Sequence, residues 1–79
     1  MGITPDELQS LRRAFRLSPR ETELLGLMLD GIGANSGLAE RMGVTVGTVK
    51  GLVHSLLVKI GTSEKLEAAI IALRHLGRL

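Results

Sequence analysis

Apolar residues recur every three or four positions along this chain, and glycines separate the groups. This spacing matches the turn of an α-helix, whereas a half-buried β-strand would alternate every second residue. No stretch of the sequence shows that alternation, and no long repeat or low-complexity tract interrupts the pattern. The spacing therefore predicts an all-α fold, and a length of 79 residues allows one domain with a small core.

Two short segments mark helix starts. Thr4-Pro5-Asp6-Glu7 and Ser18-Pro19-Arg20-Glu21 each place a hydroxyl at the N-cap, proline at the first helical position and glutamate at the third. The first helix should begin after Thr4, within an N-terminal extension of residues 1–16. The second should end at Gly31.

The middle of the chain predicts a short helix followed by a long one. Asn35 is expected to cap the short helix, which Gly43 should end. Thr45 should cap a fourth helix from about Val46 to Ile60, and a fifth should run from about residue 64 to residue 76. A short and a long helix joined by a few residues have the spacing of a helix-turn-helix.

Four segments carry a resemblance to a known family. In chain order they are Leu17–Glu21, Leu38–Val44, Thr48–Lys50 and Leu56–Gly61. Together they resemble the signature of LuxR/GerE-type helix-turn-helix domains over residues 17 to about 73. The resemblance implies a compact four-helix domain in residues 17–79, preceded by the additional helix. It also implies a transcriptional regulator that binds duplex DNA through a recognition helix at about 46–60.

Several positions depart from the family pattern. The loop between Gly31 and Ala39 is one residue longer than usual in the family. Leu52 stands in place of a common histidine, and Val53 in place of a polar or basic residue. Polar residues that usually flank the Thr-Val-Lys segment are replaced by Gly47 and Gly51. The scaffold is therefore expected to be intact and the DNA-reading surface to be altered.

The fourth helix should have one core face and one free face. At about 100° per residue, the expected core arc contains Val46, Val49, Leu52, Val53, Leu56, Leu57 and Ile60. The residues expected to meet DNA are Asn35, Ser36, Thr45, Val46, Gly47, Thr48, Lys50, Gly51, His54 and Ser55. Lys50 can pair with a phosphate or a guanine edge, and the hydroxyls and free amides at the helix start can donate to phosphate. His54 either contacts DNA or has no role.

The two glycines on the free face have three explanations. Each costs a helix interior about 1 kcal/mol relative to alanine, so their presence favours close approach by DNA or by a partner helix. Drift on an unused surface is the third explanation. A protein-interaction module, such as an antiactivator or co-regulator that binds a larger regulator or RNA polymerase, is therefore the alternative function.

The charge pattern is mildly basic, with a formal net charge of +2. Arg12, Arg13, Arg16 and Arg20 lie close together in sequence and form either a solvated helix face or a nucleic-acid contact. Phe15 is the only aromatic residue. Single-strand binding by base stacking is therefore excluded, because it needs several aromatic side chains.

The fifth helix is apolar on both sides. Its inward stripe is expected to be Leu66, Ala69, Ile70, Leu73 and Leu76. The opposite side, with Ala68, Ile71, Ala72 and His75, is expected to form a homodimer contact, the role the last helix has in related domains. A lone exposed isoleucine is the alternative explanation for that side.

Other function classes lack their residues. No catalytic motif and no phosphate-binding loop occurs, and the two histidines lack partners at metal-ligand spacing, so neither an enzyme nor a metal or other cofactor is expected. No membrane-spanning run and no signal peptide is visible. Together with the absence of cysteine, this predicts a cytoplasmic location.

Overall fold

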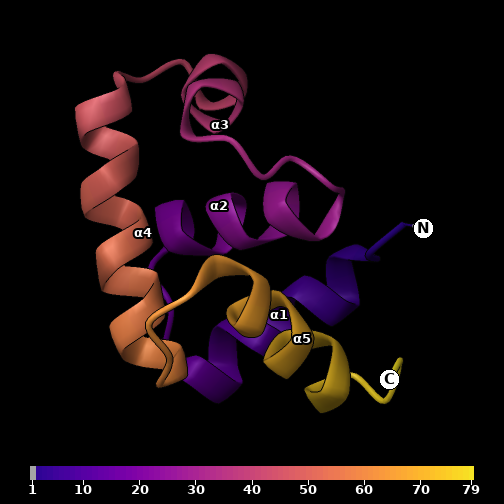
Figure 1. Cartoon of the computed structure of the whole chain (residues 1–79). Coiled ribbons are helices and arrows are strands. Elements are labelled where there is room, and N and C mark those ends of the chain that lie inside the picture. Colours follow the sequence, from indigo (N-terminus) through magenta and orange to yellow (C-terminus); the bar gives the residue numbers. More distant parts are fainter. Residues whose placement is uncertain (1) are drawn as a thin grey trace.

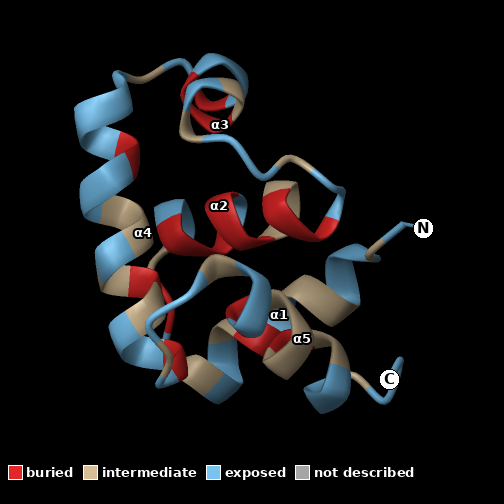
Figure 2. Cartoon of the chain, viewed as in Figure 1, coloured by how far each residue is buried: buried red, intermediate tan, exposed pale blue. Residues whose placement is uncertain are grey.

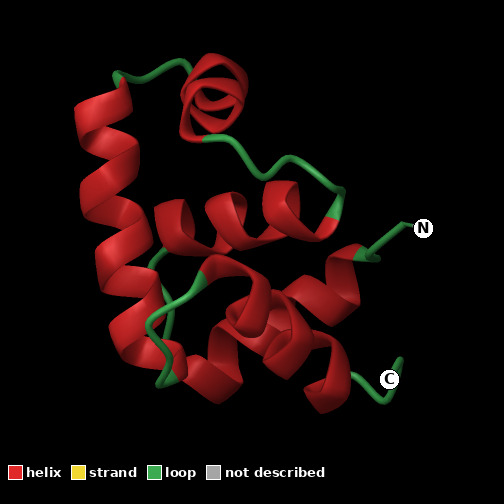
Figure 3. Ribbon diagram, viewed as in Figure 1, coloured by secondary structure: helices red, strands yellow, loops and turns green. Residues whose placement is uncertain are grey.

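The computed structural model describes residues 2–79 and places them in helices joined by short loops (Figures 1 and 3). The helices are α1 (Pro5–Phe15), α2 (Pro19–Leu29), α3 (Asn35–Met42), α4 (Val46–Ile60) and α5 (Lys65–His75). No strand occurs among the described residues. The all-α fold predicted from the apolar spacing is confirmed.

Both predicted capping boxes start helices. The Thr4 hydroxyl accepts a hydrogen bond from the Glu7 amide at 3.1 Å, and the Glu7 carboxylate accepts one from the Thr4 amide at 3.0 Å. Ser18 and Glu21 make the same exchange, at 3.1 and 2.7 Å. These side chains satisfy amides that the first helical turn leaves unpaired, so α1 and α2 begin where the sequence predicts.

The start of α3 differs from the prediction. Its N-cap is Ala34, and Asn35 is the first helical residue and makes no capping bond. Instead, the Asn35 side-chain oxygen accepts a hydrogen bond from Lys65 Nζ at 2.9 Å, and the same lysine donates to the Gly33 carbonyl. The predicted local cap is replaced by a contact with α5, which lies far away in sequence.

Helices α3 and α4 form the predicted helix-turn-helix. Gly43 ends α3 in the left-handed region (φ 69°), and the Thr45 hydroxyl caps α4 by accepting from the Thr48 amide at 3.1 Å. Within residues 2–79 no single helix is long and apolar enough to cross a membrane, and α3 and α4 reach that length and composition only as a pair bent by 104°. That bend lies within the range of about 90–120° between the helices of such motifs.

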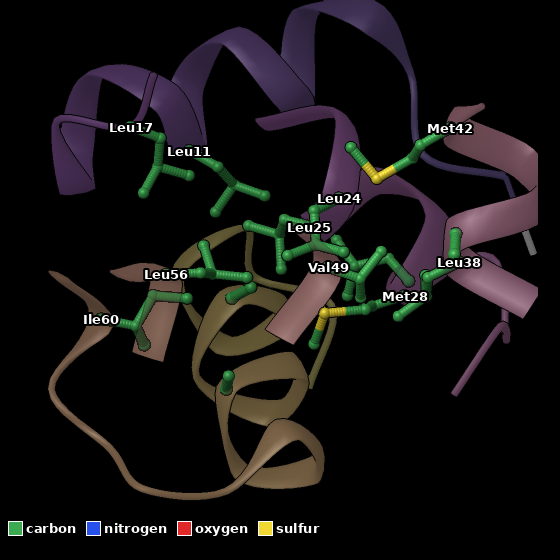
Figure 4. Close-up of a cluster of buried hydrophobic side chains, with 14 residues drawn as sticks. Leu11, Leu17, Leu24, Leu25, Met28, Leu38, Met42, Val49, Leu56 and Ile60 are labelled. Carbon is green, nitrogen blue, oxygen red and sulfur yellow. The ribbon is translucent and has the colours of Figure 1, made fainter. Parts of the chain in front are cut away.

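One core joins all of the helices (Figures 2 and 4). Fully buried members include Leu11 of α1, Leu24 and Leu25 of α2, Leu38 of α3, Val49 and Leu56 of α4, and Ala68 and Ala72 of α5. Val44, in the turn between α3 and α4, also packs against this core. Because Leu11 belongs to the same core, α1 is an integral part of the packing.

Candidate nucleic-acid interface

One face of α4 is free along the length of the helix (Figure 2). Val49, Leu56 and Ile60 are buried and define the inner side. At about 100° per residue, the opposite side is centred near Gly47 and Val58. Lys50 and His54 are exposed beside them. We call the surface formed by Gly47, Lys50, Gly51, His54 and Val58 the free face of α4.

The N-terminal turn of α4 has features that favour the binding of an anion. Thr45, Val46 and Thr48 are exposed there, and the first turn contains no acidic residue. The Thr45 hydroxyl satisfies only the Thr48 amide. Helix geometry leaves the amides of Val46 and Gly47 without an intrahelical acceptor, at the positive end of the helix dipole. Such amides bind phosphate oxygens without any basic side chain.

The glycines of the free face are not required by packing within the chain. A Cβ atom at Gly51 would meet no atom within 4 Å, and one at Gly47 would meet only the Thr45 hydroxyl, at 3.8 Å. Gly26 differs, because a Cβ there would lie 3.3 Å from the Leu8 side chain. Neither Gly47 nor Gly51 has positive φ. Because both residues lack a side chain, the backbone of α4 is accessible there to another molecule.

Lys50 and His54 are the two basic residues of the free face. Lys50 is exposed and makes no ion pair with a residue that the structure describes. Helix α4 contains no acidic residue that would oppose it. Lys50 is therefore exposed and unpaired among the described residues, and its contact with a phosphate or a base edge stays a prediction.

Ser55 is turned away from the free face, contrary to the prediction. Its hydroxyl donates to a carboxylate oxygen of Glu21, while Lys59 Nζ donates to the other oxygen at 2.7 Å. Burial raises the pKa of Glu21, but the hydrogen bonds from Lys59, the Ser18 amide and Ser55 outweigh it and lower the pKa to about 2. Ser55 is thus a structural residue that fastens α4 to the start of α2.

Glu21 is the important residue that our sequence analysis missed. We had assigned it only to the capping box, yet its side chain is buried and links α2 to α4. One signal was available: Glu21 lies three, four and seven positions before Leu24, Leu25 and Met28, which places an acid on the core face of its helix. A buried carboxylate needs a cationic partner, and Lys59 is that partner.

Most of the other residues predicted to contact DNA are exposed. Ser36, Thr45, Gly47, Thr48, Gly51 and His54 are exposed, in α3 and α4 or beside them. Asn35 is half-buried and occupied by Lys65. Val46, which we had placed in the core arc as well as in the contact set, is 40% exposed, so its core assignment was wrong.

The structure corrects the predicted faces of α5 in part, because two residues of the expected homodimer side are buried in the core. Ala68 and Ala72 are fully buried and Ile71 packs against the core, whereas Leu66 is 74% exposed. His75 is exposed and its ring meets Phe15 of α1 edge-on, with centroids 5.6 Å apart. Because α5 lies against both α2 and α4, small alanines at the contact let the helices approach closely. Leu66 turns outward, whereas Leu73 and Leu76 of the predicted inward stripe still pack against the core.

Among residues 2–79, no cluster of three or more histidine or acidic side chains could hold a metal ion. A hollow lies between the loop after α2 and the start of α5, lined by Met28, Ile32, Lys65, Leu66 and Ala69 among others. It is separate from the free face of α4 and contains no carboxylate or histidine among its lining residues.

Comparison with known proteins agrees with this geometry. The sequence profile described as "Bacterial regulatory proteins, luxR family" matches residues 16–72. The chain belongs to the LuxR family. The match includes the helix-turn-helix and most of α5, and it leaves α1 outside.

Two curated relatives are similar to this LuxR-family chain. One is the "DNA-binding transcriptional activator DevR/DosR" of Mycobacterium tuberculosis, 39% identical over 71% of this chain and 25% of the relative. Another is the "Transcriptional regulatory protein LnrK" of Bacillus subtilis, 30% identical over 89% of this chain and 31% of the relative. The chain thus spans a third or less of the length of these relatives. No solved structure gives a significant match.

Proposed function

We propose that this chain binds duplex DNA through the free face and N-terminal turn of α4, and thereby regulates transcription in the cytoplasm. One observation carries the proposal. The second helix of a helix-turn-helix bent by 104° presents an exposed Lys50 with no acid on the same helix. The printed description of one relative as a DNA-binding transcriptional activator supports the same function.

Binding on this surface should depend mainly on the DNA backbone. The free face offers one lysine and one histidine as side chains that reach outward, so few bidentate contacts to bases are available. Phosphate contacts release counterions, and affinity should therefore fall steeply as salt increases.

We further propose a homodimer formed by the outward side of α5. Leu66 is exposed and Ile70 is half-buried. At about 100° per residue, Ile70 lies opposite the buried Ala68–Ala72 side. A symmetric contact through this stripe would present two copies of α4 to two DNA half-sites.

Charge reversal of Lys50 tests the main proposal. Lys50→Glu should abolish binding to a random duplex of about 30 base pairs at low salt, because it places an anion beside phosphates. Arg74→Glu is the matched control, since it makes the same charge change at an exposed residue of α5. The readout is fluorescence anisotropy. The proposal fails if folded wild-type protein does not bind at about 50 µM, or if Lys50→Glu binds as wild type does.

A second candidate function uses the same surface for a protein partner, such as a larger regulator or RNA polymerase. Val58, at the centre of the free face, is 67% exposed and lies about 12 Å along the axis from Lys50. Together with Gly47 and Gly51 it makes an uncharged strip suited to a helix. If this function is correct, Gly51→Leu should abolish capture of the partner while Lys50→Glu leaves it unchanged.

A further inference from the structure

Three exposed arginines lie at or beside the connection between α1 and α2. Arg13 is in the last turn of α1, Arg16 is its C-cap, and Arg20 is in the first turn of α2. Arg13 and Arg16 make no ion pair with a described residue, and Arg20 pairs only with the exposed Glu23, at 3.0 Å. Such an exposed pair is weak and can exchange for another anion. We call Arg13, Arg16 and Arg20 the arginine corner.

The arginine corner is attached to the side of α4. Lys59 Nζ of α4 donates to the backbone carbonyl of Arg16 at 3.2 Å. Lys59 and Ser55 also bind Glu21, the residue next to Arg20. In Figure 1 the connection from α1 to α2 accordingly passes alongside α4. The backbone of the corner is therefore bonded to α4, although α1 lies outside the family match at residues 16–72.

The backbone of the arginine corner and the side chain of Lys50 are on opposite sides of the free face of α4. On a helical wheel, Lys59, which binds the Arg16 carbonyl, and Ser55, which binds Glu21, lie about 100 and 60° from Val58, and Lys50 lies about 80° from Val58 in the other direction. A helix in a major groove about 12 Å wide has one sugar–phosphate backbone on each side. With α4 in such a groove, the arginine corner would lie toward the sugar–phosphate backbone on the side opposite Lys50.

Nearby acids neutralise only one member of the arginine corner, Arg20. The carboxylate of Glu21 is bound by Lys59, Ser55 and the Ser18 amide, and Glu23 neutralises only Arg20. At the far end of α1, Glu7 is bound by Arg78. Arg13 and Arg16 therefore carry uncompensated charge.

We propose that the arginine corner binds phosphates of the DNA strand that runs along the α2 side of α4, so that α1 is a second DNA-contacting element. This inference rests on the function proposed above for α4. The planar guanidinium suits it, because its donors can bind two phosphate oxygens at once. The contact carries no base sequence and should add affinity equally on all duplexes.

The salt dependence of binding tests the inference. The plot of log K against log salt has a negative slope. Arg13→Gln and Arg16→Gln should each reduce the magnitude of this slope by about 1, and the double variant by about 2. The loss should be the same on two unrelated duplexes. Arg13→Lys and Arg16→Lys should retain the slope, and Arg74→Gln, an exposed arginine of α5, should leave it unchanged.

A second measurement does not depend on affinity. Because the chain has no cysteine, Arg13→Cys and Arg74→Cys each offer a single site for a tethered iron chelate. Cleavage of end-labelled duplex should occur from position 13, just outside the groove that α4 occupies, and not from position 74.

Several outcomes would overturn the inference. An unchanged slope in both glutamine variants, the same loss in Arg74→Gln, or no cleavage from position 13 would each do so. If the wild type binds and Lys50→Glu does not, such a result removes only the role of α1. If the folded wild type does not bind duplex DNA at all, the function proposed for α4 fails with it.

Discussion

Glu21 performs two tasks with one carboxylate. It closes the capping box of α2 through the Ser18 amide, and it accepts hydrogen bonds from Ser55 and Lys59 of α4. Its pKa of about 2 reflects how strongly these donors favour the charged form over the cost of burial. One ionised side chain therefore links α4 to the start of α2, in addition to the apolar contacts of the shared core.

The ionisation of Glu21 should make folding sensitive to acid. Its folded-state pKa is lowered from 4.5 to about 2, so its stabilisation is complete above pH 4.5 and is lost as pH falls toward 2. The shift corresponds to about 3 kcal/mol. We expect Glu21→Gln to lower the free energy of unfolding at pH 7 by about that amount, and the difference from wild type to shrink between pH 5 and pH 2.

Urea unfolding followed by circular dichroism across this pH range measures the effect. Glu23→Gln is the control, because Glu23 belongs to an exposed pair and its loss should change stability by less than about 0.5 kcal/mol. A gap between Glu21→Gln and wild type that does not depend on pH would contradict the expectation. Glu7 titrates in the same range, and comparing the two proteins cancels its contribution.

At the scale of elements, exposed glycines on the free face lower the stability of α4. Gly51 is exposed in the interior of the helix, and no neighbour occupies the place of its missing side chain. Glycine is less favourable there than alanine because it loses more backbone entropy on folding. A surface that tolerates this cost is consistent with a function that needs close approach to the backbone of α4.

Alanine at position 51 separates stability from function. Gly51→Ala should raise the free energy of unfolding by about 1 kcal/mol. If DNA approaches the backbone closely, the added methyl should also weaken duplex binding. Thermal unfolding and anisotropy titration measure the two effects.

Gly61→Ala is the contrasting variant. Gly61 ends α4 with φ at 92°, where a side chain is strained. This substitution should therefore destabilise the protein. Destabilisation by Gly51→Ala would show that this position has a packing role that its open surroundings do not reveal.

At the scale of the whole molecule, the two ends of the chain are tied together. Arg78 donates to both carboxylate oxygens of Glu7 at 2.8 Å and to the Gly2 carbonyl at 3.0 Å. The Phe15–His75 contact is a second link between α1 and α5. These contacts hold α1 onto the LuxR-type unit, and they add to the burial of Leu11 in the shared core.

Substitution of Arg78 should raise the pKa of Glu7. Hydrogen bonds from Arg78 and from the Thr4 amide lower the pKa of Glu7 to about 2. In Arg78→Gln the pKa should rise toward 4.5 and stay below it, because the Thr4 amide still donates. Carboxyl NMR titration measures this change, and an unaltered pKa would mean that the ion pair does not form in solution.

Self-association should depend on the outward side of α5. Ile70→Glu places a charge in the proposed symmetric contact and should shift sedimentation toward the monomer without loss of helicity. Glu67→Gln, on the same helix at an exposed position, is the control. Concentration-independent sedimentation of the wild type as a monomer would contradict the dimer.

The sequence by itself determined what depends on neighbours along the chain. Thr4, Ser18 and Thr45 cap the helices they precede, and Gly43 and Gly61 end helices with positive φ. These are local interactions, so their residue types and spacing are sufficient to predict them. The exposed positions of Lys50 and Gly51 followed in the same way from the period of a single helix.

Only the tertiary structure decided which of two equally apolar sides of α5 faces the core. Ala68 and Ala72 face inward where α5 lies against α2 and α4, a contact made with residues distant in sequence. The same reason explains Asn35 and Ser55, whose local roles are replaced by Lys65 and Glu21. A partner that lies 30 or more positions away is chosen by the packing of the helices, and periodicity along one helix contains no information about it.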